Sequence, residues 1–166
     1  MLNAEVRRLL SPIPGLTVLV AVGNPWRRDD GVAGYIASCL KPSDGLAVLE
    51  AGETPERILD EVAQHAPARV IMLDAADFRG TPGEARMISR KDLPGQCLST
   101  HSIPLGWVAD LIQSETGAPV FCLGIQIADA GFGEGLSTEV RHTAEEIVRL
   151  INGQGKAGKG SWEIEE

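Results

Sequence analysis

Leu16-Thr-Val-Leu-Val-Ala-Val22 is a short, continuously apolar run that stops at the turn residues Gly23-Asn24-Pro25. It is rich in β-branched side chains and lacks apolar/polar alternation, which is typical of a strand buried on both faces of a parallel sheet. Arg69–Leu73 and Val120–Gln126 have the same character. Parallel strands need long crossover connections, usually helices, so the three runs favour an α/β fold.

The segments between these runs supply the helices. Helical spacing of apolar residues predicts helices over Gly31–Leu40, from Thr54-Pro55 onward, over Ile103–Ile112 and over Ser137–Ile151. Leu46–Leu49 is a further short strand, and Glu84–Ser89 is an expected edge strand. The resulting alternation predicts a three-layer α/β/α sandwich around a mainly parallel, twisted sheet of about five strands.

The chain length of 166 residues indicates one domain. We expect it to occupy residues 1–151, with residues 1–15 as an irregular leader because Pro12 and Pro14 interrupt that segment. Residues 152–166 have the Gly- and Lys-rich, acidic-ended composition of a flexible tail.

The charge balance, the length of the apolar runs and the cysteine spacing narrow the classes of function to consider. Fifteen Lys and Arg face 23 Asp and Glu, a net charge of −8, which disfavours binding to nucleic acids or anionic membranes. No apolar run approaches the roughly 18 residues of a membrane span. The three cysteines are scattered and show no C-x-x-C spacing, as expected of a protein in the reducing cytoplasm.

Side chains that bind metals follow the predicted strands. Asp29-Asp30 comes after the first strand, Asp74 ends the third, and His101 lies in the polar loop Ser99–Ser102. In open α/β sheets, functional groups gather beyond the carboxyl ends of the strands. If the fold brings them together, two carboxylates and an imidazole suit a divalent transition metal and leave coordination positions open.

Each of these residues also has a purely structural explanation. Asp30 before Gly31 is placed to cap a helix, Asp74 or Asp77 could form an Asx-turn, and His101 could be a hydrogen-bonded loop histidine. Cys97, four residues before His101, offers a Cys/His nucleophile pair as a further alternative, although Pro94-Gly95 disfavours helical spacing there.

Six segments together resemble the [NiFe]-hydrogenase maturation endopeptidases. The first loop, Val22-Gly-Asn-Pro-Trp-Arg-Arg-Asp-Asp-Gly-Val32, is similar to the opening signature of that family. The others follow in order over about residues 17–151: Glu50–Glu56, Leu73–Asp77, Pro82-Gly-Glu84, Ser99–Leu105 and Phe121–Gln126. Ser99–Leu105 and Leu123–Gln126 are most similar to the formate-hydrogenlyase, or hydrogenase 3, type. Glu50 and Ala51 depart from the usual Asp and Gly of the family.

This resemblance implies an α/β protease. It implies that the protein removes the C-terminal peptide from the precursor of a [NiFe]-hydrogenase large subunit once nickel has been inserted. The metal ligands would be Asp30, Asp74 and His101, with Asp30 and Asp74 also acting in an aspartic-type or metal-assisted mechanism. The nickel would be carried by the precursor, and we expect a monomer that does not insert into membranes.

Two alternative functions remain open at this point. One is a non-catalytic nickel-recognising chaperone of the same precursor. The other is a peptidyl-tRNA hydrolase-like esterase, which has a similar Gly-Asn-Pro turn. That enzyme, however, needs a histidine soon after the turn and a basic surface for tRNA, whereas this chain has Asp29-Asp30 and a net charge of −8.

Overall fold

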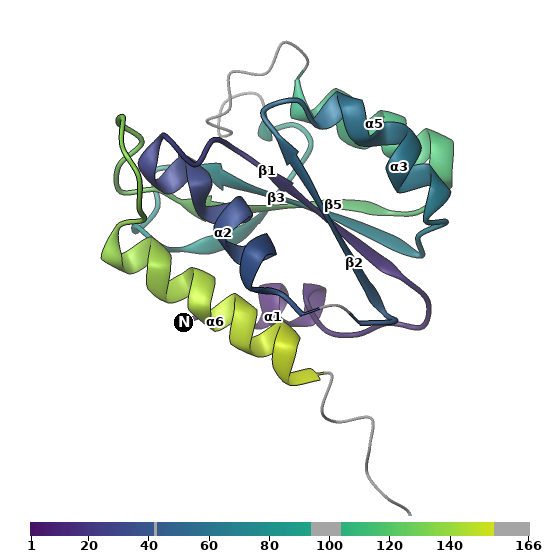
Figure 1. Cartoon of the computed structure of the whole chain (residues 1–166), viewed down its shortest axis with the longest axis horizontal. Helices are drawn as coiled ribbons and strands as arrows, with labels where there is room; N and C mark the ends of the chain where they lie inside the picture. Colours follow the sequence, from purple (N-terminus) through teal and green to yellow (C-terminus); the bar gives the residue numbers. More distant parts are fainter. Residues whose placement is uncertain (42, 94–103, 155–166) are drawn as a thin grey trace, which may run out of the picture.

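The computed structural model describes residues 1–41, 43–93 and 104–154 (Figure 1). One twisted sheet runs through its centre in the strand order β2-β1-β3-β5-β4. Neighbouring strands pair in parallel except β4, which lies antiparallel to β5 at one edge. The strands are β1 (Thr17–Val22), β2 (Leu46–Gly52), β3 (Arg69–Ala76), β4 (Ala85–Ile88) and β5 (Val120–Gln126).

Helices cover both faces of this sheet, which confirms the predicted three-layer sandwich. On one face lie α1 (Ala4–Leu9), α2 (Val32–Cys39) and α6 (Thr138–Gln154). On the other lie α3 (Leu59–Gln64) and α5 (Leu105–Thr116). The short 3₁₀ helices η1 (Arg28–Gly31) and η2 (Pro55–Ile58) lead into α2 and α3. Within the described ranges, no helix has the length and apolar character needed to cross a membrane.

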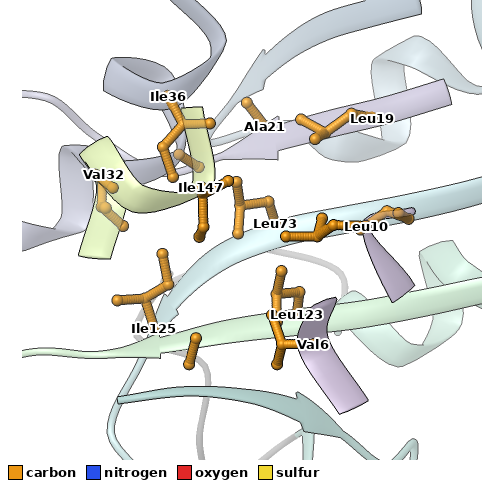
Figure 2. Close-up of a cluster of buried hydrophobic side chains, with 14 of the residues drawn as sticks. Val6, Leu10, Leu19, Ala21, Val32, Ile36, Leu73, Leu123, Ile125 and Ile147 are labelled. Carbon is orange, nitrogen blue, oxygen red and sulfur yellow. The ribbon is translucent and has the colours of Figure 1, made fainter. Parts of the chain in front are cut away.

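The central strands are apolar without alternation because both of their faces are buried. In β1, Leu19 and Ala21 point into the α1/α2/α6 layer, where Figure 2 shows them near Ile36 and Ile147. Val18 and Val20 alternate with them and join the cluster on the α3/α5 side. Successive side chains of a strand point to opposite faces, so one apolar run serves two cores.

The prediction of an irregular leader is wrong, because residues 1–15 contain helix α1. Asn3 caps it by accepting a hydrogen bond from the Val6 N–H at 2.9 Å. Val6 and Leu9 of this helix are buried in the core, and Figure 2 shows Val6 there. The prolines limit the helix to the residues before them but do not prevent it.

Two predicted boundaries also move. Helix α6 continues to Gln154, so residues 152–154 are helical rather than part of a tail, while residues 155–166 lie outside the described part of the chain. The third strand does not stop at Asp74 but pairs with β5 as far as Ala76. Asp74 is therefore an internal residue of a buried strand.

Candidate active site

The loop after β1 turns back on itself and can do so only with glycine at its start. Gly23 has a φ of +138°, and a Cβ there would lie 2.0 Å from the carbonyl oxygen of Asp30. Its N–H donates to the Gly52 carbonyl at the end of β2 at 2.9 Å. Because of this close approach, η1 lies over the carboxyl end of β1.

Asp30 is held inside this loop with only 1% of its surface exposed. Its Oδ2 accepts a hydrogen bond from the Asn24 N–H at 3.1 Å. The Asn24 side chain donates in turn to Glu53 Oε1 at 3.3 Å, which links the loop to the segment after β2. The capping explanation for Asp30 is wrong, because the capping positions are occupied by Arg27 for η1 and by Gly31 for α2.

Asp74 lies near the same end of the sheet, on the neighbouring strand β3. It is 2% exposed and lies opposite Gly124 of β5. Leu73, one residue earlier, pairs with Ala21 of β1, so Asp74 is placed beside the end of β1 where the Gly23 loop begins. Because η1 packs against β3, the fold brings the elements that carry Asp30 and Asp74 together.

The Asx-turn explanation applies to Asp77 and not to Asp74. Asp77 Oδ1 accepts a hydrogen bond from the Arg79 N–H at 3.1 Å and another from the Gln126 amide at 3.1 Å. These bonds, the one from Gln126 first, lower the pKa of the Asp77 carboxyl. Asp77 is therefore a turn-forming carboxylate, and Asp74 has a different role.

The third predicted ligand, His101, lies outside the described residues, as does Cys97. Among residues 1–41, 43–93 and 104–154, no group of three or more His, Cys, Asp or Glu side chains is arranged to hold a metal ion. The described chain offers two buried carboxylates, Asp30 and Asp74. Carboxylate oxygens suit a divalent cation, but two of them would need a further donor from elsewhere.

Asp29 has a role that the sequence did not reveal. It is 0% exposed, and its carboxylate accepts four hydrogen bonds from the segment between β5 and α6. The donors are the N–H groups of Ala128, Asp129 and Ser137 and the hydroxyl of Ser137, at 2.7–2.9 Å. Asp29 therefore fixes that distant segment beside η1. The adjacent Asp-Asp pair gave no signal that one of its members would bind backbone 100 residues away.

Two cavities among the described residues lie at opposite ends of the strands. One of about 410 Å³ adjoins the Gly23 loop and is lined by Val22, Pro25, Glu50 and Glu134, among others. A second, of about 480 Å³, lies at the opposite end of the strands, around Thr17 and Arg69. The larger cavity is remote from Asp30 and Asp74, so we assign the candidate site to the end of the sheet where the carboxyl ends of the parallel strands lie.

A mainly parallel α/β sandwich with two buried carboxylates, Asp30 on η1 and Asp74 in β3, is the class of structure found here, and the comparisons agree with it. A family model described as hydrogenase maturation protease (HycI) matches residues 32–154, and the chain belongs to this family of hydrolases. The predicted function as a hydrogenase maturation protease is thus confirmed.

Particular relatives refine this assignment. The hydrogenase 3 maturation protease of Escherichia coli K12 is 29% identical over 153 residues, 90% of this chain and 97% of the relative. The crystal structure of a [NiFe] hydrogenase maturation protease HycI from Thermococcus kodakarensis KOD1 superposes with a TM-score of 0.79 at 28% identity, covering 92% of this chain and 99% of that one. The solution structure of the endopeptidase HycI from Escherichia coli gives 0.73 at 29% identity, over 91% and 99%.

Proposed function

We propose that this chain is the endopeptidase that removes the C-terminal peptide from the precursor of a [NiFe]-hydrogenase large subunit. Family membership supports the reaction, and the relatives of hydrogenase 3 type support the substrate class. The observation that carries the proposal is the burial of Asp30 and Asp74 at one edge of the sheet, on elements that pack together. Buried carboxylates at strand ends are seldom retained unless a partner or a ligand uses them.

The precursor's nickel is the natural ligand for this pair. We propose that Asp30 and Asp74, together with His101, bind nickel that the precursor already carries. Two carboxylate oxygens and an imidazole nitrogen suit a divalent transition metal, and three protein ligands leave positions for groups of the precursor. Nickel is then part of the substrate, and its recognition restricts cleavage to precursors that have received it.

The work of the protein's own residues would be positioning and proton transfer. Holding the precursor by its metal places the scissile peptide bond at the carboxyl edge of the sheet, and positioning alone can lower a barrier by several kcal/mol. A carboxylate at that edge can accept the proton of the attacking water, and this step typically contributes 10²–10⁴-fold. We propose Asp30 and Asp74 for this role.

Incubation of the protein with nickel-loaded and nickel-free precursor tests the proposal. We expect a single fixed mass loss at the C-terminus of the nickel-loaded precursor, measured by intact-protein mass spectrometry, and no loss from the nickel-free form. Stable complex formation without any mass loss would instead identify a chaperone and contradict the proposal.

Substitution at Asp74 provides the matched control. Asp74→Asn should abolish processing, whereas Asp77→Asn should retain it, because Asp77 serves the turn after the same strand and an amide oxygen can still accept its hydrogen bonds. Equal activity of the two variants would exclude Asp74 from the site.

We further propose that the reaction takes place in the cytoplasm. Cys39 and Cys122 are free thiols, as expected in a reducing compartment.

A further inference from the structure

We infer that Trp26 and Phe132 form a docking surface for an apolar segment of the precursor, next to the bond that is cleaved. The inference rests on the proposed function, because it takes the precursor as the partner. It adds a contact that does not involve the metal. We name these two side chains the aromatic pair.

The aromatic pair is far more exposed than large apolar side chains usually are. Trp26 is 63% exposed and Phe132 is 92% exposed. The protein contains six Trp and Phe residues in all, and two of these six side chains are exposed here. Scattered exposed apolar residues need no explanation, but two on segments whose backbones are paired indicate a binding surface.

Backbone pairing holds the two residues next to each other. The Gly133 N–H donates to the Trp26 carbonyl at 2.9 Å, and the Arg28 N–H donates to the Gly133 carbonyl at 2.9 Å. Arg27 and Gly133 thus form a parallel bridge, which places Trp26 opposite Phe132, one position earlier on each segment. The backbones that carry Trp26 and Phe132 are therefore neighbours, and both side chains are exposed.

Side-chain contacts to η1 also hold the segment that carries Phe132 in place. The four hydrogen bonds to the Asp29 carboxylate hold residues 128–137 against η1, and Arg28 forms an ion pair with Asp129 at 3.9 Å. In Figure 1 this segment, in green before α6, rises beside the start of α2. A surface fixed in this way loses little conformational freedom when a partner binds, which favours affinity.

The position of the aromatic pair identifies the partner. Trp26 follows Asn24 by two residues, and Asn24 accepts the Trp26 N–H at 2.9 Å while donating its own N–H to Asp30. A precursor whose scissile bond lies at Asp30 and Asp74 would therefore lie next to this loop. The cavity of about 410 Å³ is walled by Pro25 and Arg28 from one segment and by residues 134–136 from the other, so a concave site adjoins the exposed pair.

The test compares the double variant W26S/F132S with the wild-type protein in two assays. One assay is steady-state cleavage of the nickel-loaded precursor, which separates KM from kcat. The other is the dissociation constant for nickel-free precursor, measured by biolayer interferometry, which requires no cleavage. We expect KM and Kd to rise tenfold or more and kcat to change less than twofold, as expected for the loss of two aromatic anchors.

Two further variants control for chemistry and for folding. W26F/F132L keeps both side chains apolar and should restore KM and Kd to within about threefold of wild type. W107S removes a tryptophan of similar exposure, 68%, from α5 in the opposite helical layer and should leave both constants unchanged. Thermal melting of each variant by circular dichroism verifies that the fold is intact.

Each outcome bears on the inference. Unchanged KM and Kd in W26S/F132S, or a loss confined to kcat, would overturn the docking surface while leaving the protease function intact. A wild-type protein that binds the precursor without cleaving it would refute the proposed function alone, and Kd would still decide the docking surface. Absence of any binding to the precursor would overturn the inference. Self-association that W26S/F132S abolishes would also overturn it, because the aromatic pair would then bind a second copy of this chain.

Discussion

Asp29 and Asp30 are adjacent carboxylates whose surroundings give them separate roles. The Asp29 carboxylate is saturated by four donors from the segment after β5. Asp30 is oriented by the Asn24 N–H and lies at the edge of the sheet that Asp74 also reaches. Hydrogen bonds to a buried carboxylate are worth about 1.5–3 kcal/mol each, so Asp29 is chiefly a structural residue.

Conversion of each residue to asparagine should separate these roles. Asp29→Asn should lower the free energy of unfolding by about 2–4 kcal/mol, because an amide nitrogen cannot accept the hydrogen bonds that the lost oxygen received. Asp30→Asn should change stability much less and reduce precursor cleavage by at least about 100-fold. Urea unfolding and the mass-spectrometric cleavage assay measure the two effects. Wild-type cleavage by Asp30→Asn would remove that residue from the site.

The two described cysteines should differ in reactivity. Cys39 is exposed at the end of α2, whereas Cys122 is buried in β5. Burial raises the pKa of the Cys122 thiol to about 11, so hardly any thiolate is present at pH 8. We expect iodoacetamide to label Cys39 in the folded protein and to label Cys122 only after unfolding, as followed by peptide mapping. Equal labelling rates would contradict the burial of Cys122.

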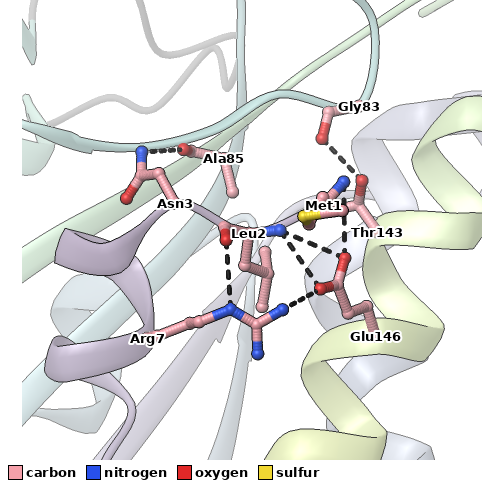
Figure 3. A network of polar contacts seen from close by, with 8 residues as sticks. All are labelled: Met1, Leu2, Asn3, Arg7, Gly83, Ala85, Thr143 and Glu146. Atoms are coloured by element: carbon pink, nitrogen blue, oxygen red, sulfur yellow. Dashed lines mark hydrogen bonds and ion pairs between the residues drawn. The ribbon is translucent and has the colours of Figure 1, made fainter.

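At the scale of the elements, α1 shows how tertiary contacts extend what local signals indicate. Figure 3 shows the start of the chain joined to α6. The Leu2 N–H donates to the Glu146 carboxylate at 3.2 Å, and Arg7 forms an ion pair with the same group. Asn3 bonds the carbonyl of Ala85 on the edge strand β4 at 3.4 Å. A six-residue helix has little stability by itself and forms here because it is docked on both sides.

Truncation of Val6 tests this docking. Val6 is fully buried beneath α1, so Val6→Ala should lower the free energy of unfolding by about 1–3 kcal/mol, through lost burial and the cavity left behind. Arg8→Ala, on the exposed side of the same helix, should change it by less than about 0.5 kcal/mol. Urea unfolding monitored by circular dichroism gives both values. An equally small effect at Val6 would mean that α1 is not docked in solution.

The link between α1 and α6 should also depend on pH. Burial alone would raise the pKa of Glu146, but the Leu2 N–H, the amino group of Met1 and the Arg7 guanidinium together hold it below its ordinary value. A carboxyl whose pKa is lower in the folded state stabilises the fold above its unfolded pKa of about 4.5. That contribution is lost as the pH falls through the folded value.

Glu146→Gln should therefore lower the melting temperature at pH 7 and lose this effect progressively in acid below pH 4.5. Scanning calorimetry of both proteins over that range measures the difference. A difference in melting temperature that stayed constant down to strongly acidic pH would show that the charge of Glu146 contributes nothing to the link.

At the scale of the whole molecule, the sequence predicted the features that follow from the spacing of apolar residues. The apolar runs of β1, β3 and β5 identified a parallel sheet, because only strands covered on both faces lack alternation. The edge position of β4 followed from its short, half-polar segment. The rule that ligands bind beyond carboxyl strand ends then placed Asp30 and Asp74 at one edge without any coordinates.

The sequence could not predict contacts that depend on the path of the loops. The pairing of Arg27 with Gly133 and the hydrogen bonds of Asp29 join segments 100 residues apart, and their residue types are common in any loop. The extension of β3 beyond Asp74 arises from pairing with β5, which overrides the local signal of a charged residue. Such contacts are properties of the assembled fold rather than of a segment.

Unpaired sheet edges can template pairing with another chain, and both edges of this sheet carry features that disfavour it. At one edge, β4 is only four residues long and contacts α1, and the Arg86 guanidinium stacks on the Phe78 ring at 4.2 Å. At the other, the register of β1 with β2 shifts after Ala21, and Glu50 of β2 is exposed. Short, irregular and charged edges disfavour pairing between sheets, and a net charge of −8 adds repulsion between copies.

We therefore expect the protein without its precursor to be a monomer. Sedimentation velocity at micromolar concentration should give one species with the 17.6 kDa mass of a single chain, unchanged between low and moderate salt. Screening by salt weakens the repulsion between copies, so salt-induced dimers would show that charge alone prevents association. A dimer at low salt would show that an edge is open despite its length and charge. A single species in both conditions would mean that the geometry of the edges is sufficient.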